Sequence, residues 1–264
     1  MNLSPETLVS FLNGLPPELM LGAELVVCFG AVLAMARLFG AAGLYVYIAV
    51  AVIGANMQVL KAVDFAIYGH PVALGTVLFA SSYLATDILA EHWGRAAART
   101  GIMIGFAAFL LWTVLLVLTL GYAPLTPEAA GEDMAWALPV QGHLQALFLP
   151  QPAFFVAGMC AYLASQLCDV WLFDRIRRLT GERRLWLRNN ASTMVSALID
   201  NAVFSVLAWV VFAPEPLGWE PLVFTYILGT YGLRLAVALL DTPFMYLSTW
   251  AVRTRTSPGP GVPA

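Results

Sequence analysis

The sequence predicts an all-α integral membrane protein, a polytopic bundle of about seven transmembrane helices. Of its 264 residues, 60% are hydrophobic and 11% are charged, whereas soluble domains have about 45–50% and about 25%. Seven apolar stretches are each long enough to cross a bilayer core, which takes about 20 residues of helix. This composition excludes a soluble globular enzyme, a disordered chain and a nucleic-acid-binding protein.

The seven stretches are interpreted as helices because backbone polar groups in lipid need partners within their own segment. They cover 19–39, 44–63, 71–90, 102–121, 148–173, 191–212 and 222–247. The third stretch is the weakest of them, since hydroxyl side chains and Asp87 interrupt it. If the first stretch does not span the membrane, a body of six helices remains.

The loops between these stretches separate by charge. Eleven of the 13 basic residues fall in loops on one side of the predicted membrane, six of them between Arg175 and Arg188. The other side has Lys61 alone, and Arg234 lies inside the last stretch. Positive charge favours the cytoplasmic side. We therefore expect the N-terminus outside and the C-terminus in the cytoplasm, as an odd number of spans requires.

A single transmembrane domain is expected over residues 1–250. A disordered cytoplasmic tail is expected over 251–264, because its last eight residues are rich in proline and glycine. In the long outer loop, 136–149 could form a short helix at the membrane interface.

Polar side chains within the predicted spans are the functional candidates, because ionisable groups are costly in a bilayer. They are Glu24, Asn56, Gln58, Asp87, Gln166, Asp169, Asn190, Thr193, Asp200, Arg234 and Asp241. Helical spacing puts those of the fifth span on one face, and those of the sixth span on another. Asp200 and Arg234 lie near the midpoints of their spans. We expect both to face the bundle interior, where they pair or share a water-filled cavity.

Simpler interpretations of the charged residues stay open. Asp87 and Asp169 could be solvated ends of helices at the cytoplasmic rim. Asp200 and Arg234 could form a structural ion pair with no part in substrate binding. Glu24 could reach the lipid headgroups of the outer leaflet.

A midplane cavity lined by carboxylates, amides and aromatics would suit a small polar ligand. It would not suit an ion channel, which uses rings of one repeated group. The sequence has no phosphate-binding Gly-Lys-Ser/Thr loop, no His-Glu-x-x-His motif and no Gly-x-Ser-x-Gly motif. We therefore expect no enzyme activity, no cofactor and no metal.

Five strings carry a resemblance to a known family. They are ANMQVLK from Ala55, SYLATDILAEHWG from Ser82, SQLCDVWLFDRIRRLTG from Ser165, LWLRNNASTMVSALID from Leu185 and LRLAVALLDTPFMY from Leu233. In this order they resemble the vitamin-uptake transporter family, described as queuosine-precursor transporters. The resemblance covers about residues 44–246.

The resemblance implies a multi-pass importer in the bacterial cytoplasmic (inner) membrane. Its substrates would be 7-cyano-7-deazaguanine and/or 7-aminomethyl-7-deazaguanine, precursors of a tRNA nucleoside, carried by secondary transport. It implies the lipid bilayer and this small molecule as partners, no nucleic acid, and leaves a homo-oligomer open. The family's polar positions fall on Asn56, Gln58, Thr86, Asp87, Gln166, Asp169, Asn190, Ser192, Thr193, Asp200 and Asp241.

Two positions depart from the family. Ala197 stands where relatives usually have glutamine, and Arg234 where they usually have lysine. Arginine keeps the charge but does not readily release a proton, which disfavours a mechanism in which this residue carries one.

Roles for individual residues follow as hypotheses. A carboxylate, Asp200 or Asp169, would accept from the ring N–H and the exocyclic amine of a deazaguanine. A donor to the ring carbonyl would come from Gln166, Asn190 or Arg234. The stacking partner would be Phe79, Tyr83, Tyr162 or Trp171.

Two other functions remain as alternatives. The chain could be the substrate-binding membrane subunit of an energy-coupling-factor transporter for a related heterocycle, which would need ATPase and scaffold partners. It could also be a membrane-embedded enzyme or assembly factor, although no metal or nucleophile constellation supports that.

Overall fold

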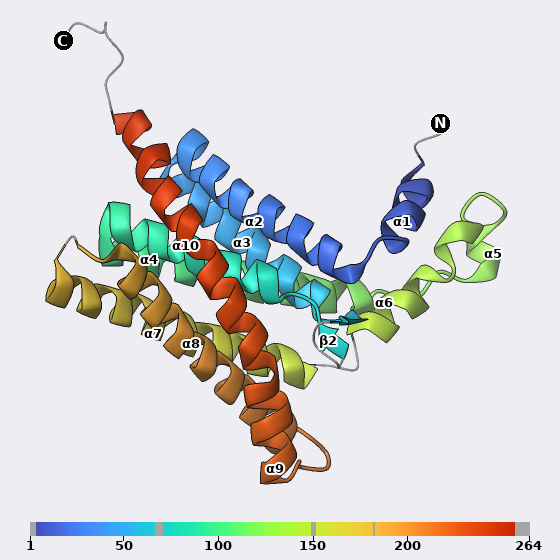
Figure 1. The fold of residues 1–264 in the computed structure, drawn as a ribbon. Helices are drawn as coiled ribbons and strands as arrows, with labels where there is room; N and C mark the ends of the chain where they lie inside the picture. Colours follow the sequence, from blue (N-terminus) through green and yellow to red (C-terminus); the bar gives the residue numbers. More distant parts are fainter. Residues whose placement is uncertain (1–3, 67–70, 149–151, 182, 257–264) are drawn as a thin grey trace, which may run out of the picture.

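The computed structural model describes residues 4–66, 71–148, 152–181 and 183–256. Long helices dominate this part of the chain (Figure 1). By length and composition, six of the described helices can cross a membrane. The predicted all-α membrane bundle is therefore confirmed.

The first two long helices are joined by a tight turn. α2 (Pro17–Phe39) and α3 (Ala41–Gln58) pack together, after a short amphipathic α1 (Pro5–Asn13). Gly40 alone separates them, with φ 65° and ψ −141°, a conformation that suits glycine. The first predicted span is thus a helix of 23 residues, long enough for the bilayer core.

A small hairpin occupies the end of the second predicted span and the start of the third. β1 (Ala62–Asp64) pairs antiparallel with β2 (Pro71–Ala73). The predicted span 44–63 therefore continues past the end of its helix, and the predicted span 71–90 begins before its helix starts. The next helix starts only at Thr76, because Gly75 adopts φ 98° at its N-terminal boundary.

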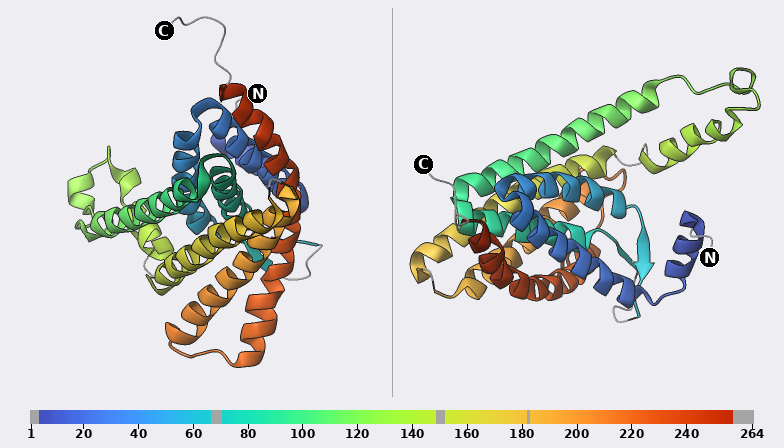
Figure 2. Two further views of the ribbon diagram at one scale, coloured as in Figure 1. Left: turned by 90° about the vertical axis from the view of Figure 1, so that its left-hand side faces the viewer. Right: turned by 90° about the horizontal axis from the view of Figure 1, so that it is seen from above.

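The longest helix covers two of the predicted spans. α4 (Thr76–Gly121) has 46 residues but is non-helical at Gly94, where φ is 83° and ψ 169°. A straight helix would place Leu89 and Gly101 about 18 Å apart, yet a Cβ at Gly101 would lie 3.0 Å from Leu89 Cδ1. The two halves therefore fold back on each other at Gly94 (Figure 2). With this reversal, α4 covers the third and the fourth predicted spans, so the six long helices of the described residues correspond to the seven predicted spans.

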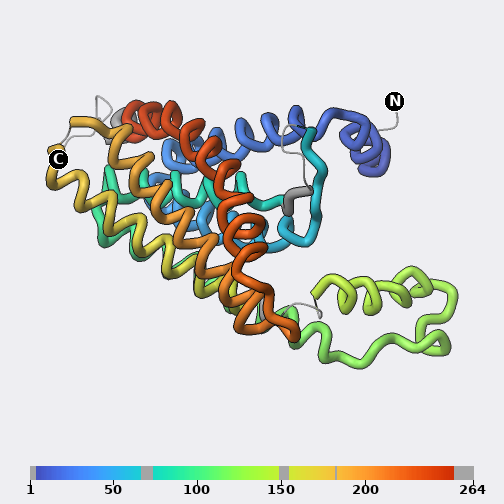
Figure 3. The backbone as a smooth tube through the Cα atoms, turned by 60° about the horizontal axis from the view of Figure 1, so that its bottom comes forward, coloured from blue at the N-terminus to red at the C-terminus, as the bar shows by residue number. Residues whose placement is uncertain are grey.

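The second half of the chain adds three long helices. An arm made of α5 (Pro127–Ala130), a short turn and α6 (Val140–Phe148) extends from the bundle (Figure 3). α6 lies within 136–149, where a short helix was expected, and its place at the membrane interface stays a prediction. α7 (Pro152–Thr180) and α8 (Leu185–Val206) pack side by side. α8 continues as a π-helical turn, Leu207–Val211.

The last long helix runs across other helices of the bundle. A short α9 (Trp219–Pro221) and the π-helical Leu222–Ile227 lead into α10 (Leu228–Thr256), which packs on α2, α4 and α8. α10 includes the first six residues of the segment 251–264 that was expected to be disordered. Residues 257–264 of that segment, and 149–151 of the fifth predicted span, lie outside the described residues.

The polarity of the bundle is that of a protein surrounded by lipid. α4 exposes Leu110, Leu111, Val117 and Leu118 on its second half, while Asp87 in its first half has no exposed area. Eighteen polar or charged residues are buried among the described residues. Polar groups turned inward beneath an apolar outer surface are expected for transmembrane helices, because lipid cannot satisfy their hydrogen bonds.

The arginine-bearing turns gather at one end of the bundle. The α2–α3 turn, the Gly94 reversal, the α7–α8 turn and the C-terminal part of α10 all lie there, on the left of Figure 1. We call this the basic end. The hairpin, the arm and α9 lie toward the opposite end. This grouping agrees with the predicted charge separation, and the assignment of the basic end to the cytoplasm stays a prediction.

Candidate functional site

A pocket lies between α3, α4, α7, α8 and α10, in the half of the bundle away from the basic end. Its empty space is about 550 Å³, counted together with the solvent at its mouth. The lining residues are Asn56, Val59, Leu60, Phe79, Phe155, Gly158, Ala161, Asp200, Phe204 and Arg234. A site of this size, mostly apolar with a few convergent polar groups, is typical of sites for small molecules.

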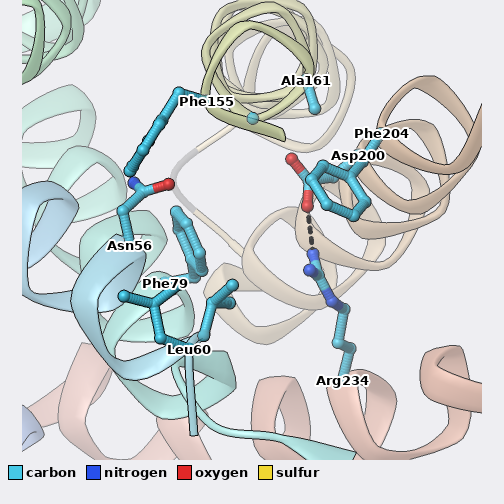
Figure 4. A pocket seen from close by; sticks show the side chains of 10 residues that line it. Asn56, Leu60, Phe79, Phe155, Ala161, Asp200, Phe204 and Arg234 are labelled. Atoms are coloured by element: carbon cyan, nitrogen blue, oxygen red, sulfur yellow. Dashed lines mark hydrogen bonds and ion pairs between the residues drawn. The ribbon is translucent and has the colours of Figure 1, made fainter. Parts of the chain in front are cut away.

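Two opposite charges form one wall of the pocket. The guanidinium of Arg234 on α10 pairs with Oδ2 of Asp200 on α8. The other oxygen, Oδ1, accepts from the Ser165 hydroxyl at 3.1 Å, and that hydroxyl also accepts from Tyr83 at 2.7 Å. These contacts fix the carboxylate while leaving it beside the cavity (Figure 4). The expectation that Asp200 and Arg234 face inward and pair is therefore confirmed.

The facing wall carries an amide and aromatic rings. Asn56 lies across the cavity from the ion pair, and Phe79 and Phe155 lie on its side (Figure 4). Asn56 Nδ2 donates to the carbonyl of Val52 at 2.8 Å, so its Oδ1 is directed away from its own helix. Phe204 lies one turn beyond Asp200 on α8. The pocket thus offers a carboxylate, a guanidinium and an amide among flat apolar surfaces.

A buried hydrogen-bonded layer separates this pocket from the next part of the bundle. Gln166 Nε2 donates to the Ser82 hydroxyl at 2.9 Å, and the Thr86 hydroxyl donates to Gln166 Oε1 at 3.0 Å. All three side chains have no exposed area. Gln166 therefore links α7 to α4 and does not line the pocket.

Below that layer lie most of the remaining candidates from the sequence. Asp87 and Asp169 are fully buried, and the Thr193 hydroxyl contacts Asp87 Oδ2 at 3.5 Å. Asp241 accepts from Asn189 Nδ2 at 2.6 Å. Asn190 Nδ2 donates to the Thr242 hydroxyl at 2.7 Å. Because Asp87 and Asp169 have no exposed area, their interpretation as solvated helix rims is wrong.

Glu24 and Gln58 form a separate contact. Gln58 Nε2 donates to Glu24 Oε1 at 2.7 Å, which joins α3 to α2. Neither side chain lines the pocket described above. Glu24 therefore has a partner inside the protein.

The basic end is closed by a cluster of ion pairs. Arg188, 1% exposed, binds Glu91 through two contacts, Nε to Oε2 at 3.1 Å and Nη2 to Oε1 at 2.5 Å. Arg177 donates to the Glu91 carbonyl at 3.1 Å, where the first half of α4 ends and leaves carbonyls without helical partners. Arg95 contacts Asp174 at 3.6 Å. This cluster ties α4, α7 and α8 together beneath the buried carboxylates.

Comparison with known proteins decides the class. A family model described as "Putative vitamin uptake transporter" matches residues 73–248. A protein of Bacillus subtilis (strain 168) named "Probable queuosine precursor transporter" is 32% identical over 222 residues, which are 84% of this chain and 90% of that protein. The chain belongs to the vitamin uptake transporter family. No solved structure matches it significantly.

The family is one of transporters, so the prediction that the chain is not an enzyme is confirmed. The resemblance drawn from the five strings is confirmed as well. The transporter is a multi-pass membrane protein, since the matched residues include four of its six long apolar helices in whole or large part.

The transporter's pocket contains three of the predicted site residues, Asn56, Asp200 and Arg234. Thr193 lies beside Arg234 and Ala197 at a smaller neighbouring cavity. The other predicted residues lie outside this pocket, in the contacts given above. Of the proposed stacking partners, Phe79 lines the pocket, whereas Trp171 is 49% exposed on the outer surface and cannot stack on a ligand inside.

Sequence reasoning missed two aromatic rings of the transporter's pocket. Phe155 precedes Tyr162 by seven residues, and Phe204 follows Asp200 by four. Both spacings extend a polar helical face by whole turns. The signal was therefore present, but an apolar side chain in an apolar span does not stand out by composition.

Proposed function

We propose that this transporter imports queuosine precursors, 7-cyano-7-deazaguanine and/or 7-aminomethyl-7-deazaguanine, across the bacterial cytoplasmic membrane by secondary transport. The observation that carries the proposal is the pairing of Asp200 with Arg234 at the wall of an aromatic-lined pocket. The name of the Bacillus subtilis relative supports the same substrate class.

The pocket chemistry matches the edges of a deazaguanine. A carboxylate such as Asp200 can accept from the ring N–H and the exocyclic amine together, as carboxylates do with base donors. Arg234 can donate to the ring carbonyl, and Asn56 can supply an amide contact from the facing wall. Phe79, Phe155 and Phe204 offer rings on which a flat bicycle can stack.

Secondary transport is supported by the sequence and by the position of the pocket. The chain has no phosphate-binding loop for nucleotide hydrolysis. The pocket lies between helices in one half of the bundle, and the cluster around Glu91 and Arg188 closes the other end. Alternating access would require that cluster to open while the pocket side closes.

Ligand-dependent stability of the purified protein tests the proposal. A ligand that binds the folded state raises the unfolding temperature. We expect 7-cyano-7-deazaguanine to raise it for wild type and for Asp133→Asn, a control in the exposed loop, but not for Asp200→Asn. Guanine and 7-aminomethyl-7-deazaguanine serve as comparison ligands. An equal shift in Asp200→Asn would remove Asp200 from the binding site, and no shift with any precursor would contradict the proposed substrate class.

A further inference from the structure

Three carboxyl groups lie together one helical turn beyond the pocket, toward the basic end. Asp87 follows Tyr83 by four residues on α4, and Asp169 follows Ser165 by four on α7. Asp241 comes from α10 and acts electrostatically on both. All three have no exposed area, and none lines the pocket.

These carboxyl groups are short of partners. Both oxygens of Asp169, Oδ1 of Asp87 and Oδ2 of Asp241 have no hydrogen-bond partner among the described residues. The Ser196 hydroxyl, fully buried beside Asp169, has none either. An ionised carboxylate buried without compensation is strongly unfavourable. Hydroxyl groups lie beside Asp169, but they carry no charge, so the cluster favours the binding of a positive species.

The nearby arginines are already engaged. Arg234 pairs with Asp200 on the pocket side, and Arg188 pairs with Glu91 on the basic side. Each arginine is thus matched to another carboxylate at a different level of the bundle. Neither provides a hydrogen bond to Asp87 or Asp169 in the described part of the chain.

The geometry favours a proton over a metal ion. The carboxyl groups of Asp87 and Asp169 lie within hydrogen-bonding reach of each other. Two carboxylates this close cannot readily both be ionised, and one proton converts their repulsion into a hydrogen bond. Asp241 acts on the pair only through its charge, and among the described residues no three acidic, histidine or cysteine side chains are close enough together to hold a metal ion.

We propose that Asp87 and Asp169 bind one proton between them, and that this proton is the coupling ion for substrate accumulation. The inference rests on the proposed function, because it assigns an energy source to that transport. The hydroxyls of Ser192, Thr193 and Ser196 surround Asp169 and would stabilise the negative charge when the proton leaves.

A continuous set of contacts connects this pair with the pocket. Asp200 in the pocket wall accepts from Ser165, which accepts from Tyr83. The next turn of the same two helices holds Asp169 and Asp87. Loss of the proton would restore repulsion between α4 and α7, and a ligand at Asp200 would act on the same helices. The proton and the substrate would then both act on the packing of α4 against α7. The binding of each would change the affinity for the other by the same factor.

Other charged and titratable groups lie on the helices packed around the pair. They are Glu91 and Tyr83 from α4, Cys168 from α7, Arg188 and Asp200 from α8, and Arg234 and Asp241 from α10. Asp241 is the one most closely comparable to the pair, since it is also fully buried and has an oxygen without a partner. It therefore belongs in the test as a separate variant.

Transport by the full chain in liposomes tests the inference. Labelled 7-cyano-7-deazaguanine is measured in exchange, without any gradient, and in accumulation driven by an imposed proton gradient. We expect wild type and Asp133→Asn to do both, with pH-dependent exchange. Asp87→Asn and Asp169→Asn should lose proton-driven accumulation down to the level of protein-free liposomes, while their exchange continues without pH dependence.

Several results would overturn the inference and leave the proposed function intact. One is wild-type exchange with no accumulation under a proton gradient. Another is accumulation that follows a sodium gradient instead. A third is full proton-driven accumulation by both asparagine variants, or loss confined to Asp241→Asn, which would move the proton to Asp241. Failure of wild type to exchange the substrate would instead contradict the proposed function.

Infrared spectroscopy tests the bound proton without any substrate. A protonated carboxyl group has its own C=O stretching band, which Asp87→Asn and Asp169→Asn should each abolish in membrane-embedded protein. The band should persist in Asp133→Asn. Persistence in both buried variants would show that the pair holds no proton, whatever the substrate is.

Discussion

Asp200 on α8 and Arg234 on α10 form an ion pair across two helices at the wall of the pocket. Their side chains keep 13% and 19% exposure, so they are accessible from the cavity. The pair holds α8 to α10 and also presents both charges to a ligand. A structural role and a binding role are therefore combined in one contact.

We expect uptake to depend on the positive charge of the side chain at position 234, whether arginine or lysine carries it. Arg234→Met leaves Asp200 without its partner, and we expect it to abolish uptake and to cost about 2–4 kcal/mol of unfolding free energy. Arg234→Lys keeps the positive charge and should retain uptake. Uptake assays and thermal unfolding measure the two effects, with the exposed Arg175→Met as control. Equal behaviour of the methionine and lysine variants would argue against a charge-based role.

The double variant separates structure from binding at this pair. Asp200→Asn combined with Arg234→Met removes both charges, so it should recover part of the stability that Arg234→Met loses, because no unpaired charge remains. Uptake should stay absent, since neither polar contact to the ligand is left. Recovered uptake in the double variant would show that the pair is structural only.

Arg188 should be a major stabiliser of the basic end. It is 1% exposed and makes two contacts with Glu91, so Arg188→Met should lower the unfolding free energy by about 3–5 kcal/mol. Arg99→Met, which changes an exposed side chain beyond the Gly94 reversal, is the matched control. Thermal unfolding of the detergent-purified proteins measures the difference. Similar losses in both variants would contradict the structure at this end.

A close helix contact makes Gly105 sensitive to substitution. A Cβ there would lie 2.5 Å from Tyr162 Oη and 2.9 Å from Ile48 Cγ2. Gly105→Ala should therefore cost about 1–3 kcal/mol of unfolding free energy. Gly22→Ala meets nothing within 4 Å and should be neutral or stabilising, since alanine favours helix. Stability of Gly105→Ala equal to wild type would show that α4 and α7 are not this close.

The orientation in the membrane can be read by chemical labelling. Cysteines are introduced as Asp133→Cys in the arm or Arg183→Cys in the α7–α8 turn, in a variant without Cys28, Cys160 and Cys168. A membrane-impermeant maleimide should label Asp133→Cys in intact cells. It should reach Arg183→Cys only after permeabilisation, because the basic end is predicted to be cytoplasmic. The reverse pattern would invert the predicted topology.

The transmembrane helices could be predicted because each one is marked by many apolar residues in a row, whose contributions to hydropathy add up. Each span accumulates apolar residues over about 20 positions, so the helix around Val32 or Leu115 is evident from composition. The hairpin at 62–64 and 71–73 was not predictable in this way. Apart from Asp64, its residues are as apolar as the spans beside them, and only Pro71 and Gly75 indicate that the helix starts later.

The functional site was predictable only in part. Polar residues in the spans identified which side chains point inward, as Asp200 and Asp169 do. The sequence did not reveal that these two lie in separate layers, because residue type carries no information on depth or partner. Gln166 is an example, since its amide binds two hydroxyls of α4 and does not line the pocket.

The most direct test of substrate import is the queuosine content of tRNA in a bacterial host that lacks both queuosine synthesis and its own precursor importer. The chain is expressed, and each deazaguanine is supplied at low concentration. We predict that wild type and Asp133→Asn restore queuosine, and that Asp200→Asn does not at equal membrane expression. Absence of queuosine with every precursor, despite folded wild-type protein in the membrane, would contradict the account.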